Sequence, residues 1–137
     1  MTTPYTGGCR CGAVRYECSA EPMFPGNCYC RQCQKASGSG HVSAFAVPEE
    51  ALTITGEVKY FDHPADNGNT ASNGFCPTCG APVLGKSSGM PGLMVIKAAS
   101  LDDPSWFKPG MNIFTESAQP WDPMDPDLPA FEGMPEL

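Results

Sequence analysis

Apolar and polar residues alternate in several short segments of the chain, and this pattern predicts strands rather than helices. In residues 13–18, Val14, Tyr16 and Cys18 fall on one side and charged residues on the other. A period of two is typical of a half-buried strand. Further strands are predicted at residues 42–47, 52–55, 58–61, 70–75 and 112–115, with a fully apolar and therefore central strand at 93–96.

The connections between these segments refine the fold. Gly56 and Glu57 separate residues 52–55 from 58–61 and predict a hairpin, and residues 64–69 read as a polar loop. Near the cysteines only residues 31–36 suit a helix, of about two turns. The chain has 15 glycines and 15 prolines, which interrupt regular structure. We therefore expect a mainly β fold of small antiparallel sheets with little helix.

A length of 137 residues suits one domain, spanning residues 1–137. Residues 119–137 are rich in proline, and we expect this C-terminal tail to be packed on the domain. Trp121, Leu128 and Phe131 are the expected anchors. The alternative is a frayed acidic tail.

The net charge of −7 disfavours nucleic acid and anionic membrane surfaces as partners. No apolar stretch approaches the ~20 residues of a membrane span, and the N-terminus lacks the pattern of a signal peptide. We therefore expect a cytoplasmic protein. In that reducing compartment its eight cysteines are better metal ligands than disulfide partners. The sequence does not indicate an oligomeric state.

Seven of the eight cysteines form three close groups. Thiolates with one or two residues between them can reach the same tetrahedral zinc ion, whereas such neighbours rarely satisfy disulfide geometry. No βαβ context supports a redox Cys-x-x-Cys pair, and the spacings differ from ferredoxin iron–sulfur runs. The groups are Cys9 with Cys11, Cys28 with Cys30 and Cys33, and Cys76 with Cys79.

Four of these thiols suit a closed zinc site. In the run CPTCG at residues 76–80, proline sets a turn and the glycine suits the positive φ that follows it. This loop supplies two ligands, and the N-terminal pair is the simplest source of the other two. A four-cysteine site is structural, because no position remains for water or substrate. Its expected ligands are Cys9, Cys11, Cys76 and Cys79.

Cys28, Cys30 and Cys33 then remain as three ligands, the number typical of a catalytic zinc that keeps its fourth position for water or substrate. Zinc with three thiolates carries a charge of −1, which suits holding an incoming thiol as a thiolate better than making hydroxide. Arg31 and Lys35 lie in the same segment, where they could attract an anionic thiol.

Other interpretations of this group stay open. Cys18 or His41 could complete a second structural site. Cys18 also suits a small buried apolar residue, and His41 an ordinary strand-edge histidine. Arg31 and Lys35 could simply be solvated.

Three segments resemble the glutathione-dependent formaldehyde-activating enzyme (GFA) family, which also includes centromere protein V. They are GGCRCGAVRY at 7–16, CYCRQCQK at 28–35 with GSG at 38–40, and FCPTCG at 75–80. The run IFTESA at 113–118, followed by Trp121, Leu128, Pro129 and Phe131, is similar to the family's C-terminus.

The resemblance implies a β-tent fold of small antiparallel sheets around zinc. It also implies Cys9, Cys11, Cys76 and Cys79 at the structural zinc, and Cys28, Cys30 and Cys33 at the second, in agreement with the assignment from spacing alone. The implied activity is that of a carbon–sulfur lyase joining glutathione and formaldehyde reversibly as S-hydroxymethylglutathione. The family's second motif commonly reads Cys-His-Cys, whereas Tyr29 stands in the middle here.

Three hypotheses follow. The first is a zinc-dependent carbon–sulfur lyase of this type, with two zinc ions, acting on an aldehyde adduct of glutathione or another small thiol. The second is a non-catalytic zinc-stabilised binding module. The third is a thiol-based metal store or sensor.

Overall fold

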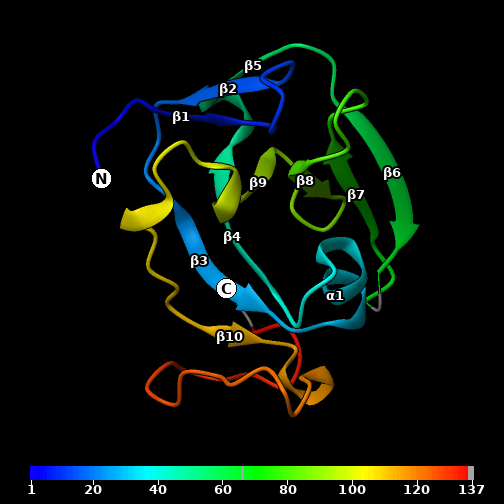
Figure 1. The fold of residues 1–137 in the computed structure, drawn as a ribbon. Coiled ribbons are helices and arrows are strands. Elements are labelled where there is room, and N and C mark those ends of the chain that lie inside the picture. The colour runs from blue at the N-terminus through cyan, green and yellow to red at the C-terminus, as the bar shows by residue number, and fades with distance from the viewer. Residues whose placement is uncertain (66, 136–137) are drawn as a thin grey trace.

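The computed structural model describes residues 1–65 and 67–135, which form two β-sheets and one α-helix (Figure 1). The smaller sheet is antiparallel, in the order β1 (Tyr5–Gly8), β2 (Arg15–Cys18) and β5 (Leu52–Thr55). The larger sheet has the order β10 (Asn112–Ile113), β3 (Met23–Cys28), β4 (Val42–Pro48), β9 (Leu93–Lys97), β8 (Pro82–Ser87), β7 (Thr70–Phe75) and β6 (Lys59–Pro64).

The prediction of a mainly β fold with little helix is confirmed. Within the described ranges, the short β10–β3 pair is the one parallel pair in the two sheets, and the other neighbours are antiparallel. No helix in the described part of the chain is long and apolar enough to cross a membrane. Single 3₁₀ turns lie at Glu49–Ala51, Ala98–Ser100, Pro104–Trp106 and Thr115–Ser117.

The predicted helix at 31–36 is present as α1 (Arg31–Ser37), directly after β3. Its N-cap is Cys30, whose Sγ accepts a hydrogen bond from the backbone amide of Cys33 at 3.3 Å. Gly38 ends the helix with a φ of +71°, and its amide donates to the carbonyl of Gln34. Cys30 thus caps the start of the helix that carries Cys33.

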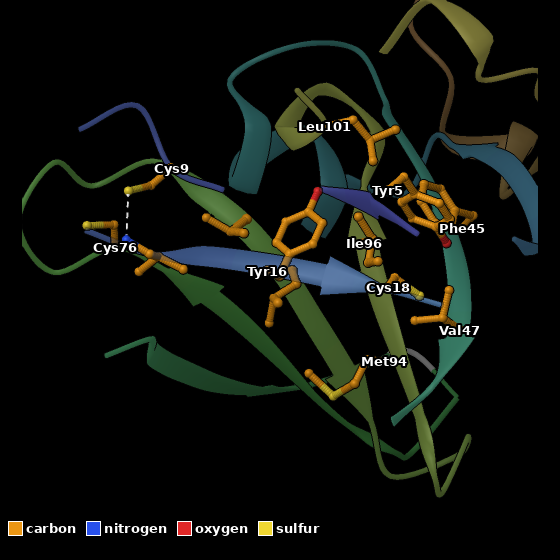
Figure 2. Packing of buried hydrophobic residues seen from close by; sticks show 13 residues of the cluster. Tyr5, Cys9, Tyr16, Cys18, Phe45, Val47, Cys76, Met94, Ile96 and Leu101 are labelled. Atoms are coloured by element: carbon orange, nitrogen blue, oxygen red, sulfur yellow. Dashed lines mark hydrogen bonds between the residues drawn. The ribbon is translucent and has the colours of Figure 1, made fainter. Parts of the chain in front are cut away.

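The main core lies between the two sheets. Val14, Tyr16 and Cys18 are buried, which confirms the predicted alternation of this segment. They pack with buried side chains of β4, β8 and β9. Figure 2 shows Cys9 and Cys76 together at one end of this cluster, with Tyr5 and Phe45 at the other. The core therefore includes cysteines of the predicted structural site.

Strand β9 occupies the middle of the seven-stranded sheet, as its apolar sequence predicts. Met94 and Ile96 are buried in the core. Val95 and Lys97, which alternate with them, line a cavity on the other face. The larger sheet therefore has two different faces, one closed by the smaller sheet and one facing a cavity.

The predicted hairpin of residues 52–55 and 58–61 is wrong. β5 pairs with β2, and β6 pairs with β7, so the two segments belong to different sheets. Gly56 has a φ of +94°, and a Cβ there would lie 1.9 Å from the carbonyl oxygen of Ala13. The glycine therefore allows a close approach to the Ala13 backbone at the end of the β2–β5 pair, within the smaller sheet, and does not form a two-residue hairpin turn. The predicted loop 64–69 includes Asp66, which lies outside the described residues; around it the amide of Ala65 bonds the Asn69 carbonyl at 2.7 Å.

Three strands escaped prediction because glycine or proline interrupts their patterns. β1 ends in Gly7–Gly8, β3 contains Pro25 and Gly26, and β8 contains Pro82 and Gly85. Pairing with longer neighbouring strands compensates for these weak local preferences.

The C-terminal segment is held by polar contacts. Trp121 is 66% exposed, so its predicted role as an apolar anchor is wrong. The amide of Asn112 donates to the carbonyl of Pro129 at 2.8 Å, and the amide of Phe131 donates to the carbonyl of Asn112 at 2.9 Å. Asp122 lies 2.6 Å from Nδ1 of His41. Figure 1 shows this segment running alongside β10.

Substitution of Gly56 by alanine should destabilise the protein more than the same change at Gly92. Both glycines have a positive φ, which costs about 1–2 kcal/mol for a residue with a Cβ. Only Gly56 adds a clash with backbone, worth roughly a further 1–3 kcal/mol. Urea unfolding of Gly56→Ala and Gly92→Ala measures the difference. Equal losses would contradict the close approach of Gly56 to the Ala13 backbone.

Candidate functional site

Four cysteines from distant parts of the chain meet between the two sheets. The sulfurs of Cys9, Cys11, Cys76 and Cys79 all lie within 4.8 Å of one another. Two of the Sγ–Sγ distances are 3.7 Å for Cys9–Cys11 and 3.8 Å for Cys11–Cys76. Zn–S bonds of 2.3 Å in a tetrahedron require sulfurs about 3.8 Å apart. This donor set fits zinc, and all eight cysteines, each within the described residues, are free thiols.

Two tight turns aim these sulfurs. The first follows β1, where the amide of Val14 donates to Cys9 Sγ at 3.2 Å. The second joins β7 to β8, where the amide of Thr78 donates to Cys76 Sγ at 3.4 Å. Gly80 closes this turn with a φ of +76°, as its position after the motif predicts. Arg10 Nη2 joins the turns by donating to the carbonyl of Cys79 at 2.9 Å.

Backbone amides favour the thiolate form in this group. Hydrogen bonds from the amides of Ala81 and Cys11 lower the pKa of Cys79 to about 6. The amide of Val14 lowers the pKa of Cys9. A metal ligand must be deprotonated, so these amides prepare the sulfurs for a cation.

A second group of three sulfurs lies at the junction of β3 and α1. Cys28 is the last residue of β3, Cys30 is the N-cap of α1, and Cys33 lies in its first turn. Their Sγ atoms also lie within 4.8 Å of one another. The end of the strand, the helix cap and the first helical turn thus bring together the three sulfurs that the sequence spacing predicts.

The three thiols influence one another's ionisation. Hydrogen bonds from Cys28 and Cys33 lower the pKa of Cys30 to about 2, and the hydrogen bonds to Cys30 and Cys33 raise the pKa of Cys28. Like charges at this separation oppose further ionisation, whereas a shared divalent cation allows several thiolates. The donor set therefore fits a soft cation such as zinc.

Neither Cys18 nor His41 completes this group. Cys18 is buried in the main core, with its Sγ 3.6 Å from the carbonyl of Ala20. His41 binds Asp122, and its ring centroid lies 4.8 Å from that of Tyr29. Across residues 1–65 and 67–135, no fourth histidine, cysteine or carboxylate lies within 4.8 Å of all three sulfurs.

The three sulfurs line a cavity of about 460 Å³ on the outer face of the larger sheet. Arg31 and Lys35, the cations expected from the sequence, are not among its described lining residues. Arg31 instead donates a hydrogen bond to Oε1 of Gln34. The lysines that line the cavity are Lys86 and Lys97.

Lys97 could have been found from the sequence. It directly follows the apolar segment 93–96, and strand alternation places it on the same face as Val95, opposite the core. Hydrogen bonds with Cys28 and Cys30 and burial have larger effects on the Cys33 pKa, but the positive charge of Lys97 also acts to lower it.

Replacing Cys76 by serine should remove one zinc per chain and lower the melting temperature. The site joins the two sheets, and zinc bound to the native state alone adds its binding free energy to stability. Elemental analysis and a thermal melt measure both effects. Cys18→Ala is the control, since it removes a buried thiol outside both groups and should keep the wild-type zinc content. An unchanged zinc content in Cys76→Ser would contradict the site.

The comparisons with known proteins agree with this arrangement. Residues 4–117 match the family described as glutathione-dependent formaldehyde-activating enzyme. No curated protein matches the chain. A crystal structure of a Rhodobacter sphaeroides protein is similar, with a TM-score of 0.56 and 21% identity over 71% of this chain and 87% of that one. That likeness concerns the fold. The family match covers most of the chain, and the chain belongs to the glutathione-dependent formaldehyde-activating enzyme family.

Proposed function

We propose that the chain is a zinc-dependent carbon–sulfur lyase that acts on the adduct of a small thiol and an aldehyde. One observation carries the proposal: Cys28, Cys30 and Cys33 converge on the wall of a cavity instead of in the core. Membership of the family supports thiol and aldehyde as the substrate classes, and glutathione with formaldehyde is the pair its name indicates.

The two cysteine groups divide the work in this proposal. Cys9, Cys11, Cys76 and Cys79 would hold a structural zinc, because they bring four sulfurs together between the sheets. Cys28, Cys30 and Cys33 would hold a second zinc. When bound there, zinc would supply a Lewis acid that lowers the pKa of an incoming thiol. The cavity would hold the aldehyde carbon beside that thiol and limit its contact with water.

The proposed reaction conserves all atoms. In the direction of synthesis, the thiol sulfur forms a bond to the carbonyl carbon, and the π electrons of the C=O bond move to oxygen. The thiol proton ends on that oxygen as the hydroxyl of the adduct. In the direction of cleavage, the carbon–sulfur bond breaks and the same proton returns to sulfur, so no oxidant or reductant is needed.

We further propose a cytoplasmic setting and a single domain over residues 1–137, with 119–137 packed on it. The reduced thiols suit a reducing compartment. The hydrogen bonds of Asn112 to the carbonyl of Pro129 and from Phe131 support the packing of the tail. Residues 136–137 lie outside the described part of the chain.

Replacing Cys30 by serine should abolish turnover while leaving a folded protein with one zinc. Cys30 supplies one of the three sulfurs of the group, whereas the four-cysteine site is separate from it. Adduct formation from glutathione and formaldehyde, measured by NMR beside elemental analysis, tests both parts. Cys18→Ala is the matched control and should keep full activity. Wild-type turnover by Cys30→Ser would exclude the mechanism.

A non-catalytic binding module is the second candidate, favoured by the exposed Trp121 on the acidic, proline-rich tail. Replacing zinc by cobalt distinguishes the two. If the Cys28 group accepts a substrate thiol, glutathione should change the cobalt absorption spectrum of the wild-type protein but not that of Cys30→Ser. A wild-type spectrum insensitive to glutathione and to other small thiols would favour the binding module.

A further inference from the structure

We propose that the cavity beside Cys28, Cys30 and Cys33 selects a thiol that carries one anionic group and an apolar substituent, and that Lys97 binds the anion. This inference rests on the proposed function, because it names the thiol that the same site would use. It makes Lys97 a specificity-determining residue. It also favours a ligand other than glutathione.

The floor of the cavity is made of small residues arranged in rows across the sheet. Gly26 of β3 pairs with Ala44 of β4, and Ala44 pairs with Lys97 of β9. In the neighbouring row, Ala46 pairs with Val95, and Val95 with Gly85. All of these residues line the cavity. Because glycine and alanine leave the floor low, the long Lys97 side chain has room to reach a ligand above it.

The charged groups on the cavity wall point to an anion. Among the described lining residues there are two lysines and no aspartate or glutamate, in a protein with a net charge of −7. Lys86 is partly committed, because its Nζ lies 4.8 Å from the centre of the Tyr60 ring. Lys97 makes no salt bridge within residues 1–65 and 67–135. Its ammonium is therefore the better candidate to receive a ligand carboxylate.

Two phenylalanines on the cavity wall have unusual backbones. Phe24 has a φ of +51° and Phe114 a φ of +54°, and they are the two non-glycine residues with positive φ in the described chain. Both line this cavity. The pairing of β3 with β4 shifts register between Met23 and Gly26, around Phe24, and such bulges redirect side chains.

Strained backbone at two residues that line the same cavity favours a functional role for those side chains. Phe24 is 39% exposed although it is large and apolar. Together with Met111 and Phe114 it adds apolar surface to the cavity lining. An alkyl or aryl substituent on the ligand would cover this surface.

Glutathione is a poorer match for this lining. It carries two carboxylates and an ammonium group, and the described wall offers no carboxylate to pair with the ammonium. A compact thiol with one carboxylate leaves fewer groups unpaired and covers more of the apolar wall.

The test is a calorimetric titration of the zinc-loaded protein with three thiols: 2-mercapto-3-phenylpropanoate, phenylmethanethiol and glutathione. The wild-type protein should bind the phenylpropanoate at least about tenfold more tightly than glutathione. Lys97→Met should weaken binding of the phenylpropanoate about tenfold and change that of the uncharged phenylmethanethiol less than twofold. Lys59→Met is the charge-matched control, because Lys59 is exposed and outside the cavity lining.

Phe24→Ala tests the apolar wall separately. It should weaken the phenylpropanoate at least fivefold but leave the smaller 2-mercaptopropanoate within twofold. Circular dichroism confirms that each variant is folded. The comparison of ligands on the wild-type protein tests the predicted thiol preference even if a variant does not fold.

Tighter binding of glutathione, an equal effect of Lys97→Met on charged and uncharged thiols, or no binding of any thiol would each overturn the assignment. Failure of the lyase proposal gives a different result. In that case the predicted order of affinities holds, but no thiol forms an adduct with an aldehyde faster than it does without protein.

Discussion

The convergence of four sulfurs at one point is the constraint on which the rest of this structure depends. Cys9 and Cys11 follow a strand of the smaller sheet, and Cys76 and Cys79 lie between two strands of the larger one. Their contact fixes how one sheet lies on the other. Cys9 and Cys76 are themselves part of the buried cluster, so the donor set and the core define the same interface. A chain with short strands and many glycines gains from a link of this kind, since regular hydrogen bonding alone holds it weakly.

The smaller sheet covers one face of the larger sheet, and the other face carries the cavity. β9 shows the division within four residues, because Met94 and Ile96 enter the core while Val95 and Lys97 line the cavity. The second group of sulfurs stands at the edge of that face, where β3 ends and α1 begins. The core-facing and cavity-facing residues therefore lie on opposite sides of the same strands, so that strands as well as loops position the cavity wall.

The sequence was most informative where chemistry demands a spacing. Both cysteine groups converge as predicted, because a shared ion requires sulfurs a few ångströms apart and short spacings satisfy that locally. The pairing of strands that lie far apart in the chain was harder to predict from the sequence. Gly56 looked like a hairpin turn, and nothing local shows that the strands on either side pair elsewhere. β3 was missed because Pro25 and Gly26 weaken its pattern, although its bulge shapes the cavity.

The unusual Tyr29 is explained by how the second group is supported. Its side chain is 1% exposed, lies against His41, and is not part of the described cavity lining. Gln34 links the same loop to the C-terminal part of the chain: its Nε2 donates to the carbonyl of Tyr29 at 2.7 Å and to that of Ser117 at 2.9 Å. His41 in turn holds Asp122 of the tail. Because buried polar networks of this kind fix one arrangement, the position of the tail and the aim of the three sulfurs depend on each other. Tyrosine at position 29 thus contributes to the support of the loop, whereas Lys97 lines the cavity.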